Sequence, residues 1–297
     1  MRLVVFGDSH INQNNIEELE KVFKEIYFYL NNNSFLICLG DYYDKNKLSA
    51  QELEFGTCWA NKFRKEVKKF YLLRGNHPLV AKEVNKYQSS IEYLKYLDIK
   101  IFDEVVVNKI YFAHKFTDKT NINLVNRNPN FEISLKELEN YKYSLLGHFH
   151  SFQELIPKRA YHLGSCIWTS FNEVNDEHKY IAIINKNVKF VKLSSPTPMR
   201  DVDNIGELQS ISNKTKVRYI FNSFEQLQKE INEVNKLKNK FYSFKVKLNF
   251  NQISPISKPH FTGKSFEECF KEWLSKIDNQ EVRKVLEEAL KNEEIQN

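Results

Sequence analysis

Acidic, histidine and asparagine side chains follow short apolar runs at five points in the first 150 residues. The five motifs, in order, are Gly7-Asp8-Ser9-His10, Gly40-Asp41-Tyr42-Tyr43-Asp44, Gly75-Asn76-His77, His114 and Gly147-His148-Phe149-His150. Carboxylate oxygens and imidazole nitrogens are ligands that hard or borderline divalent ions accept. Two such ions about 3.5–4 Å apart, bridged by a carboxylate, clamp a phosphoryl group during its displacement. The motifs therefore predict a two-metal site, and the hydrolysis of a phosphate ester as its reaction class.

The elements before the motifs must place them. Apolar runs at 2–6, 35–39 and 70–73 predict strands, and the spacing of apolar residues at 15–30, 48–66 and 80–97 predicts helices. This alternation implies βαβ units in a largely parallel sheet. Because ligands of open α/β sheets bind at the carboxyl ends of the strands, the reactive groups are expected at that edge.

The pattern changes after residue 100. Residues 101–113 predict a hairpin that turns at Asn108-Lys109, residues 134–141 a short helix, and residues 143–146 a strand. Further strand-like pieces, which indicate a second and more antiparallel sheet, lie at 153–156, 159–163, 179–184 and 188–193. The predicted fold class is α/β, with residues 1–194 as a two-sheet α/β sandwich.

Two breaks rich in serine and proline divide the rest of the chain. After the first, at 194–198, a strand at 216–221, a helix at 223–237 and a strand at 241–250 predict a small α+β cap over residues 195–252. The second break belongs to a linker at 253–264, and residues 265–297 hold one or two amphipathic helices. Their apolar stripe either packs back on the core or docks into a groove of a partner.

Composition limits the environment more than the activity. The net charge of +6 permits a polyanionic partner without demanding one. The four cysteines, none spaced as a zinc knuckle or redox pair, are Cys38, Cys58, Cys166 and Cys269. They suggest a reducing, cytoplasmic location. Met1 leads directly into a strand, so no signal peptide is expected, and no apolar run of about 18 residues predicts a membrane span.

Over residues 1–193, the ordered motifs resemble the calcineurin-like metallophosphoesterase superfamily. The resemblance implies that one metal ion is held by Asp8, His10, Asp41 and His150. It implies that a second is held by Asn76, His114, His148 and the bridging Asp41. The expected ions are Mn²⁺ or Mg²⁺, with Mn²⁺ preferred. Residues two apart in a strand face opposite ways, so His148 and His150 can serve different ions only if the chain turns after Gly147.

The same resemblance gives catalytic roles to two further residues. A metal-bridging hydroxide would attack phosphorus, because divalent ions lower the pKa of bound water. His77 matches a non-ligand histidine that stabilises the transition state or protonates the leaving oxygen. Asp44 could orient His77, although a role in the turn is the alternative. Pro78 departs from the pattern, since many relatives have an acidic residue there.

Several other residues near the motifs have a structural interpretation. Tyr42 and Tyr43 are expected to be core or rim aromatics rather than groups that contact the substrate. Arg74 either contacts phosphate or forms a structural ion pair. Three histidines match no motif and are expected to have no functional role, namely His162, His178 and His260.

Residues downstream of the last motif narrow the resemblance. The segments 161–165, 169–173 and 179–184 resemble the SbcD-type DNA repair nucleases, whereas Lys45-Asn46 and the closely spaced last histidines depart from Ser/Thr protein phosphatases. The narrower resemblance implies a DNA exonuclease and single-strand endonuclease that acts in repair or recombination. It implies that the cap seats DNA and that the C-terminal helices dock on an SMC-like ATPase of the SbcC type; a homodimer is possible.

Two rival functions use the same motifs. A small-molecule phosphodiesterase or phosphomonoesterase would use the cap as a lid, and a non-catalytic scaffold would be expected to have lost ligands, which this chain has not. The cap is locally basic, which indicates either a solvated face or phosphate contacts. Its basic residues are Lys214, Lys216, Arg218, Lys229, Lys236, Lys238, Lys240, Lys245 and Lys247.

Overall fold

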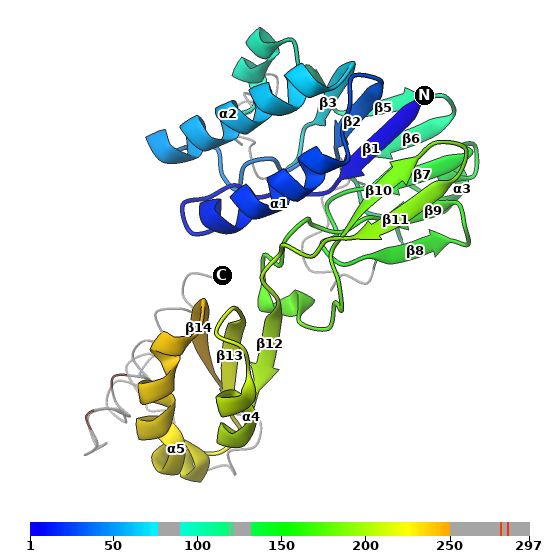
Figure 1. The fold of residues 1–297 in the computed structure, drawn as a ribbon. Coiled ribbons are helices and arrows are strands. Elements are labelled where there is room, and N and C mark those ends of the chain that lie inside the picture. The colour runs from blue at the N-terminus through cyan, green and yellow to red at the C-terminus, as the bar shows by residue number, and fades with distance from the viewer. Residues whose placement is uncertain (77–89, 119, 121–131, 250–279, 281–283, 285–297) are drawn as a thin grey trace, which may run out of the picture. The chain divides into compact units, whose positions relative to one another are not determined.

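The chain divides into two units, Met1–Pro196 and Thr197–Asn297 (Figure 1). The computed structural model describes residues 1–76, 90–118, 120, 132–249, 280 and 284. The predicted linker at 253–264 and, apart from residues 280 and 284, the predicted helices at 265–297 lie outside the described residues. No described helix is long and apolar enough to cross a membrane.

The first sheet of the first unit has six strands in the order β11-β10-β1-β2-β3-β4. Four of them are parallel: β1 (Arg2–Phe6), β2 (Ser34–Cys38), β3 (Lys69–Leu73) and β4 (Lys100–Phe102). The sequence predicts the first three, but it assigns the residues of β4 to the hairpin at 101–113. The antiparallel strands β10 (Tyr180–Ile184) and β11 (Val188–Lys192) extend this sheet beside β1. The prediction that they belong to the second sheet is wrong. β10 buries Ile181 on one face and Ala182 on the other, which suits a strand inside a covered sheet.

The second sheet has five strands in the order β5-β6-β7-β9-β8. Its strands are β5 (Glu104–Val107), β6 (Ile110–Ala113), β7 (Tyr143–Leu146), β8 (Gln153–Ile156) and β9 (Ala160–His162). The predicted hairpin forms over residues 104–113 rather than 101–113, because residues 100–102 pair with β3 in the first sheet. Its turn is confirmed: Asn108 and Lys109 have φ of 51° and 63°, as a two-residue type I′ turn requires. The sheet is mixed, because β6, β7 and β9 are parallel to one another.

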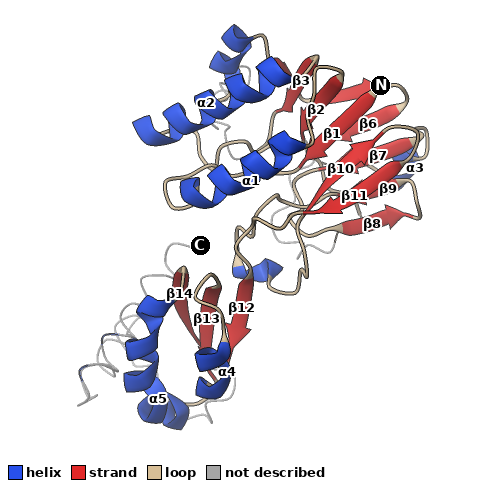
Figure 2. Ribbon diagram, viewed as in Figure 1, coloured by secondary structure: helices blue, strands red, loops and turns tan. Residues whose placement is uncertain are grey.

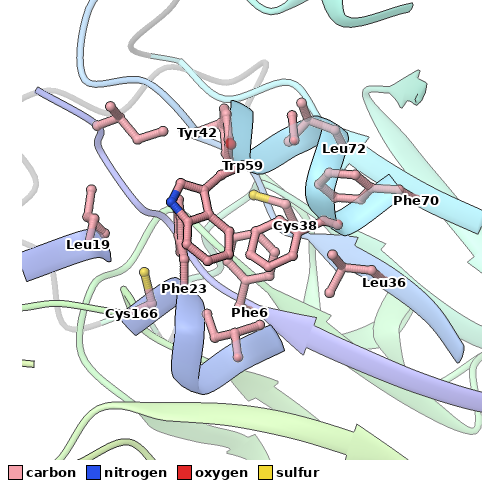
Figure 3. Packing of buried hydrophobic residues seen from close by; sticks show 14 of the residues in the cluster. Phe6, Leu19, Phe23, Leu36, Cys38, Tyr42, Trp59, Phe70, Leu72 and Cys166 are labelled. Atoms are coloured by element: carbon pink, nitrogen blue, oxygen red, sulfur yellow. The ribbon is translucent and has the colours of Figure 1, made fainter. Parts of the chain in front are cut away.

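Helices cover the outer face of the first sheet (Figure 2). They are α1 (Ile16–Phe28) and α2 (Ala50–Glu66), and α2 begins with a capping box between Ser49 and Glu52. On β1, Val4 and Phe6 face these helices, while Leu3 and Val5 pack in the core between the sheets. Figure 3 shows the helix-side core, where Phe6, Phe23 and Trp59 pack together. The two-sheet α/β sandwich is therefore confirmed.

Short helical elements complete the first unit. The short helix α3 (Leu135–Leu138) buries Leu138 against the second sheet, and η4 is a 3₁₀ turn at Phe171–Glu173. The predicted helix at 80–97 is described only at its end, where η1 (Glu92–Leu97) is a 3₁₀ helix rather than an α-helix.

The second unit contains three parallel strands in the order β12-β13-β14. Its elements are β12 (Met199–Val202), α4 (Ile205–Ser210), β13 (Lys216–Phe221), α5 (Phe224–Leu237), the 3₁₀ turn η5 (Lys238–Lys240) and β14 (Ser243–Leu248). It is thus an α/β unit of crossover connections instead of the predicted α+β cap. The sequence prediction omitted β12 and α4, which are too short to show a clear period.

Candidate metal centre

Strand ends from both sheets supply the predicted site residues. The motifs containing Asp8, Asp41 and Asn76 follow the carboxyl ends of the parallel strands β1, β2 and β3. His114 follows β6, and the motif of His148 and His150 follows its parallel neighbour β7. The sandwich therefore brings segments that are far apart in the sequence to one edge, as the strand pattern predicts.

Three of these residues have a left-handed backbone, which is rare for residues other than glycine. The φ angles are 46° at His10, 39° at Asp41 and 79° at His148. Each such conformation costs on the order of 1–3 kcal/mol and persists only where surrounding contacts impose it. The His10 amide donates a hydrogen bond to the Asp41 carbonyl oxygen at 2.9 Å, and the His148 amide donates to Oδ2 of Asp8 at 2.8 Å. The loops thus hold one another, and the chain turns at His148 as a split of His148 and His150 between two ions requires.

The site residues form two clusters. The first cluster is Asp8, His10 and His150, and the second cluster is Asp41, His114 and His148; within each, one potential ligand atom from every residue lies within 4.8 Å of the others. Asn76 joins the second cluster, because its Oδ1 is 2.9 Å from both Nε2 of His114 and Nδ1 of His148. The seven predicted ligands are therefore brought together in the two predicted groups.

Asp41 connects the clusters. Its Oδ2 lies 3.1 Å from Nε2 of His114 in the second cluster and 3.8 Å from Nε2 of His10 in the first. The side chain is buried, with 1% of its surface exposed. A buried carboxylate that reaches both groups of imidazoles is placed as a bridging ligand must be.

Two motif glycines allow the backbone to pass directly against the side chains of the site. A Cβ atom on Gly75 would lie 1.8 Å from Oδ1 of Asp41, well inside van der Waals contact. Gly40 has φ of 121°, and a Cβ there would lie 2.3 Å from Nδ1 of His114. These positions exclude a side chain because the backbone must pass directly against the site.

Burial and neighbouring charges shift the pKa values of several site residues. Burial lowers the pKa of His114, but Asp41 and Asp8 outweigh burial and raise it to about 10. Burial, together with the charge of His114, lowers the pKa of His148 to about 4. Burial raises the pKa of Asp8, but His114 reverses this and holds it below the usual value. The Asp8 carboxylate therefore stays ionised, and a bound cation would stabilise it in place of the His114 proton.

The donor set fits two divalent ions. Oδ1 of Asp8 is buried and has no hydrogen-bond partner among the described residues; the His114 ring lies 3.5 Å from it, with its Nδ1 already directed to the Leu39 carbonyl. A divalent ion would satisfy this oxygen directly. The other donors are carboxylate oxygen, amide oxygen and imidazole nitrogen. When bound, such ions supply the Lewis acidity that activates water and stabilises charge on phosphoryl oxygens.

Two histidines have a fixed acceptor at Nδ1, while their Nε2 points into their own cluster. Nδ1 of His114 is 3.0 Å from the Leu39 carbonyl oxygen, and Nδ1 of His10 is 3.1 Å from Oδ1 of Asp44. Each acceptor directs Nε2 toward the site, an arrangement typical of metal-binding histidines. Asp44 thus contacts a predicted ligand. His77 lies outside the described residues, so its pairing with Asp44 stays a prediction.

Sequence reasoning gave no role to the residues behind His150. Thr169 Oγ1 is 2.8 Å from Nδ1 of His150, and Thr169 donates a hydrogen bond to Glu173, which in turn binds Lys179. One signal was present in the sequence: Ser170 and Glu173 have the spacing of a capping box, and the structure forms one.

The other aromatic and basic residues of the motifs have structural contacts. Tyr42 and Tyr43 are fully buried in the core, as expected. Arg74 forms ion pairs with Glu92 at 2.7 Å and Asp103 at 3.1 Å, which is the structural alternative for this residue.

The histidines that match no motif are absent from both clusters as far as the structure describes them. Burial lowers the pKa of His162 to about 3, and Nε2 of this ring is 2.9 Å from Oγ1 of Thr120. His178 packs edge-on against Tyr180. His260 lies outside the described residues.

A comparison with protein families matches residues 1–184 to the calcineurin-like phosphoesterases. The chain belongs to the calcineurin-like phosphoesterase family. It is therefore a metal-dependent hydrolase of phosphate esters, and both clusters lie within the matched residues.

Solved structures similar to this calcineurin-like phosphoesterase include the phosphoesterase Yfce from E. coli, with 14% identity, a TM-score of 0.34, and coverage of 65% of this chain and 94% of that one. A single mutant of Vps29 from Entamoeba histolytica has 13% identity, a TM-score of 0.31, and coverage of 65% and 98%. The nuclease MPE from Pseudomonas putida has 17% identity, a TM-score of 0.32, and coverage of 64% and 87%. Among curated proteins, none matches this sequence.

Proposed function

We propose that this phosphoesterase is a DNA nuclease, an exonuclease and single-strand endonuclease that uses two divalent ions, Mn²⁺ by preference, and acts in repair or recombination. The observation that carries the proposal is the pair of clusters joined by Oδ2 of Asp41. The proposed ligands of the first ion are the first cluster with Asp41, and those of the second ion are the second cluster with Asn76. Two ions bridged by one carboxylate suit the displacement at phosphorus that cleaves a phosphodiester.

A row of basic side chains on the second unit supports DNA as the substrate. Along β14, Phe244, Val246 and Leu248 pack toward the core beneath α5, so Lys245 and Lys247 point to the opposite face of the sheet. Both lysines are exposed, and Lys245 is paired in register with Arg218 of β13. The Arg218 guanidinium is itself neutralised by a two-bond ion pair with Asp201 of β12, so the two lysines supply the positive charge of the row. Cations in such a row suit a phosphate backbone, which contributes most of the affinity for nucleic acids.

The test compares two substrates in Mn²⁺: DNA with double-stranded and single-stranded regions, and a small chromogenic phosphodiester. The double variant Lys245→Glu/Lys247→Glu is expected to weaken DNA cleavage roughly tenfold or more, since two phosphate contacts become repulsive. Its turnover of the small ester should stay within about twofold of wild type. The salt dependence of DNA binding should also become less steep.

The matched control is Lys229→Glu/Lys236→Glu, which makes the same charge change at exposed positions of α5, on the helix-covered side of the sheet. It should cleave DNA at nearly the wild-type rate. Equal losses in both double variants would show that net charge, not the β14 row, matters. Turnover of the small ester while DNA remains intact would favour a phosphodiesterase or phosphomonoesterase of small substrates.

We propose an SMC-like ATPase of the SbcC type as the partner, contacted by the C-terminal segment. Deleting residues 263–297 should spare turnover of the small ester and abolish co-purification with that ATPase, because the proposed apolar docking stripe would be gone. A truncated chain that still binds the ATPase would remove the docking role. Sedimentation of the full-length and the truncated chain would show whether either forms a homodimer.

A further inference from the structure

A buried lysine and a glutamate lie directly behind the first cluster. Lys179, with 2% of its surface exposed, donates hydrogen bonds to Glu173 at 2.6 Å, to Asp176 at 2.7 Å and to the carbonyl oxygen of His150 at 3.0 Å. Oγ of Ser165 lies 3.0 Å from the same carboxylate oxygen of Glu173 and 2.6 Å from the Ile167 carbonyl oxygen, so its one hydrogen is shared between these acceptors. A carboxylate held by an ammonium group and hydroxyls is an acceptor on every side, which keeps it ionised.

The second oxygen of Glu173 fixes the hydroxyl of Thr169. Oε1 of Glu173 accepts from the amides of Thr169 at 3.2 Å and Ser170 at 2.9 Å, and also from the Thr169 hydroxyl. A hydroxyl has one hydrogen, and an ionised carboxylate can only accept. Thr169 must therefore donate its one hydrogen to Glu173, so it can only accept a hydrogen bond from His150.

This arrangement determines which nitrogen of His150 carries a proton. Thr169 Oγ1 lies 2.8 Å from Nδ1 of His150, and Oε1 of Glu173 lies 3.4 Å from the same nitrogen. Both oxygens can only accept here, so Nδ1 must be the donor. The other nitrogen, Nε2, lies 3.0 Å from Nε2 of His10 at the centre of the first cluster. With its proton on Nδ1, the neutral ring presents the Nε2 lone pair to an ion at that point.

We infer that Thr169, held by Glu173 and Lys179, is a positioning residue that sets the tautomer and orientation of His150 for binding the ion of the first cluster. The inference rests on the two-metal site of the family and not on DNA as the substrate. The role of Thr169 differs from those of Asp44 and the Leu39 carbonyl, because a neutral hydroxyl needs a charged group behind it to become an acceptor only.

The test is Mn²⁺ binding to the full chain, measured by titration calorimetry in the absence of substrate. Thr169→Val keeps the shape of the side chain and removes the hydroxyl, and it should weaken one of two Mn²⁺ sites by roughly 10- to 100-fold, as loss of such a contact usually does. Thr169→Ser restores the hydroxyl and should bind within about threefold of wild type. Wild-type affinity in Thr169→Val would overturn the inference.

Thr120→Val is the matched control, because it removes a buried hydroxyl from His162, a ring outside both clusters. Its Mn²⁺ affinities should match those of wild type. A second measurement uses the wild-type protein and so does not depend on the folding of any variant. Nitrogen NMR of the Mg²⁺-loaded chain should show that Nδ1 of His150 is protonated. A proton on Nε2 instead would overturn the inference, even if DNA cleavage were fully established.

Discussion

Replacing Asp41 by alanine is expected to lower turnover of a small phosphodiester by roughly 10³-fold or more and to lower the occupancy of both metal ions. Its Oδ2 lies 3.1 Å from a His114 nitrogen and 3.8 Å from a His10 nitrogen, so one side chain serves both clusters. Loss of two Lewis acids removes several kcal/mol of transition-state stabilisation, and each 1.36 kcal/mol is a factor of ten in rate.

The effect of Asp41→Ala can be followed without substrate. Elemental analysis should find fewer than two Mn²⁺ ions per chain after gel filtration, whereas wild type keeps both. In the metal-free variant, the pKa of His114 should fall from about 10, because Asp41 is the strongest of the charges that oppose burial there. An NMR titration of the ring measures this shift.

The control for this variant is Asp103→Ala, which removes an exposed carboxylate from the ion pair with Arg74, outside both clusters. It should retain both ions and nearly full turnover. If Asp41→Ala still held two ions per chain, Asp41 would not be the bridge, and the division into two clusters would need another explanation.

The parts of the fold that the sequence predicts depend on local signals. Short apolar runs that end at Gly-Asp or Gly-Asn turns predict β1, β2 and β3, and parallel pairing then brings Asp8, Asp41 and Asn76 to one edge. The other site residues are predicted from the order and the residue types of the motifs.

Other parts could not be predicted because they depend on contacts between distant segments. β10 has the same pattern whether it pairs with β1 or joins the second sheet, and the burial of Ile181 against the helix-side core decides the matter. The partner of a histidine nitrogen is similarly a tertiary property. The sequence links Asp44 to the motif of Asp41, but only the folded chain places it on His10.

His77→Ala is the second variant with a large expected effect. Turnover of DNA should fall by about 10²- to 10⁴-fold, the usual contribution of a general acid, while both metal ions remain. His77 directly follows Asn76, whose Oδ1 lies 2.9 Å from ring nitrogens of His114 and His148 in the second cluster. Because His77 is next to the metal centre but is not a predicted ligand, its loss should affect turnover and not metal binding. The measurements are metal content and turnover, with His178→Ala as a control outside the site.

The two roles considered for His77 predict different dependence on the leaving group. If His77 protonates the leaving oxygen, His77→Ala should impair DNA cleavage far more than turnover of an ester with a nitrophenolate leaving group, which departs without a proton. If it stabilises charge on the phosphoryl oxygens instead, both substrates should lose rate to a similar extent. Full activity on both substrates would exclude a catalytic role, and loss of a metal ion would make His77 part of the metal centre.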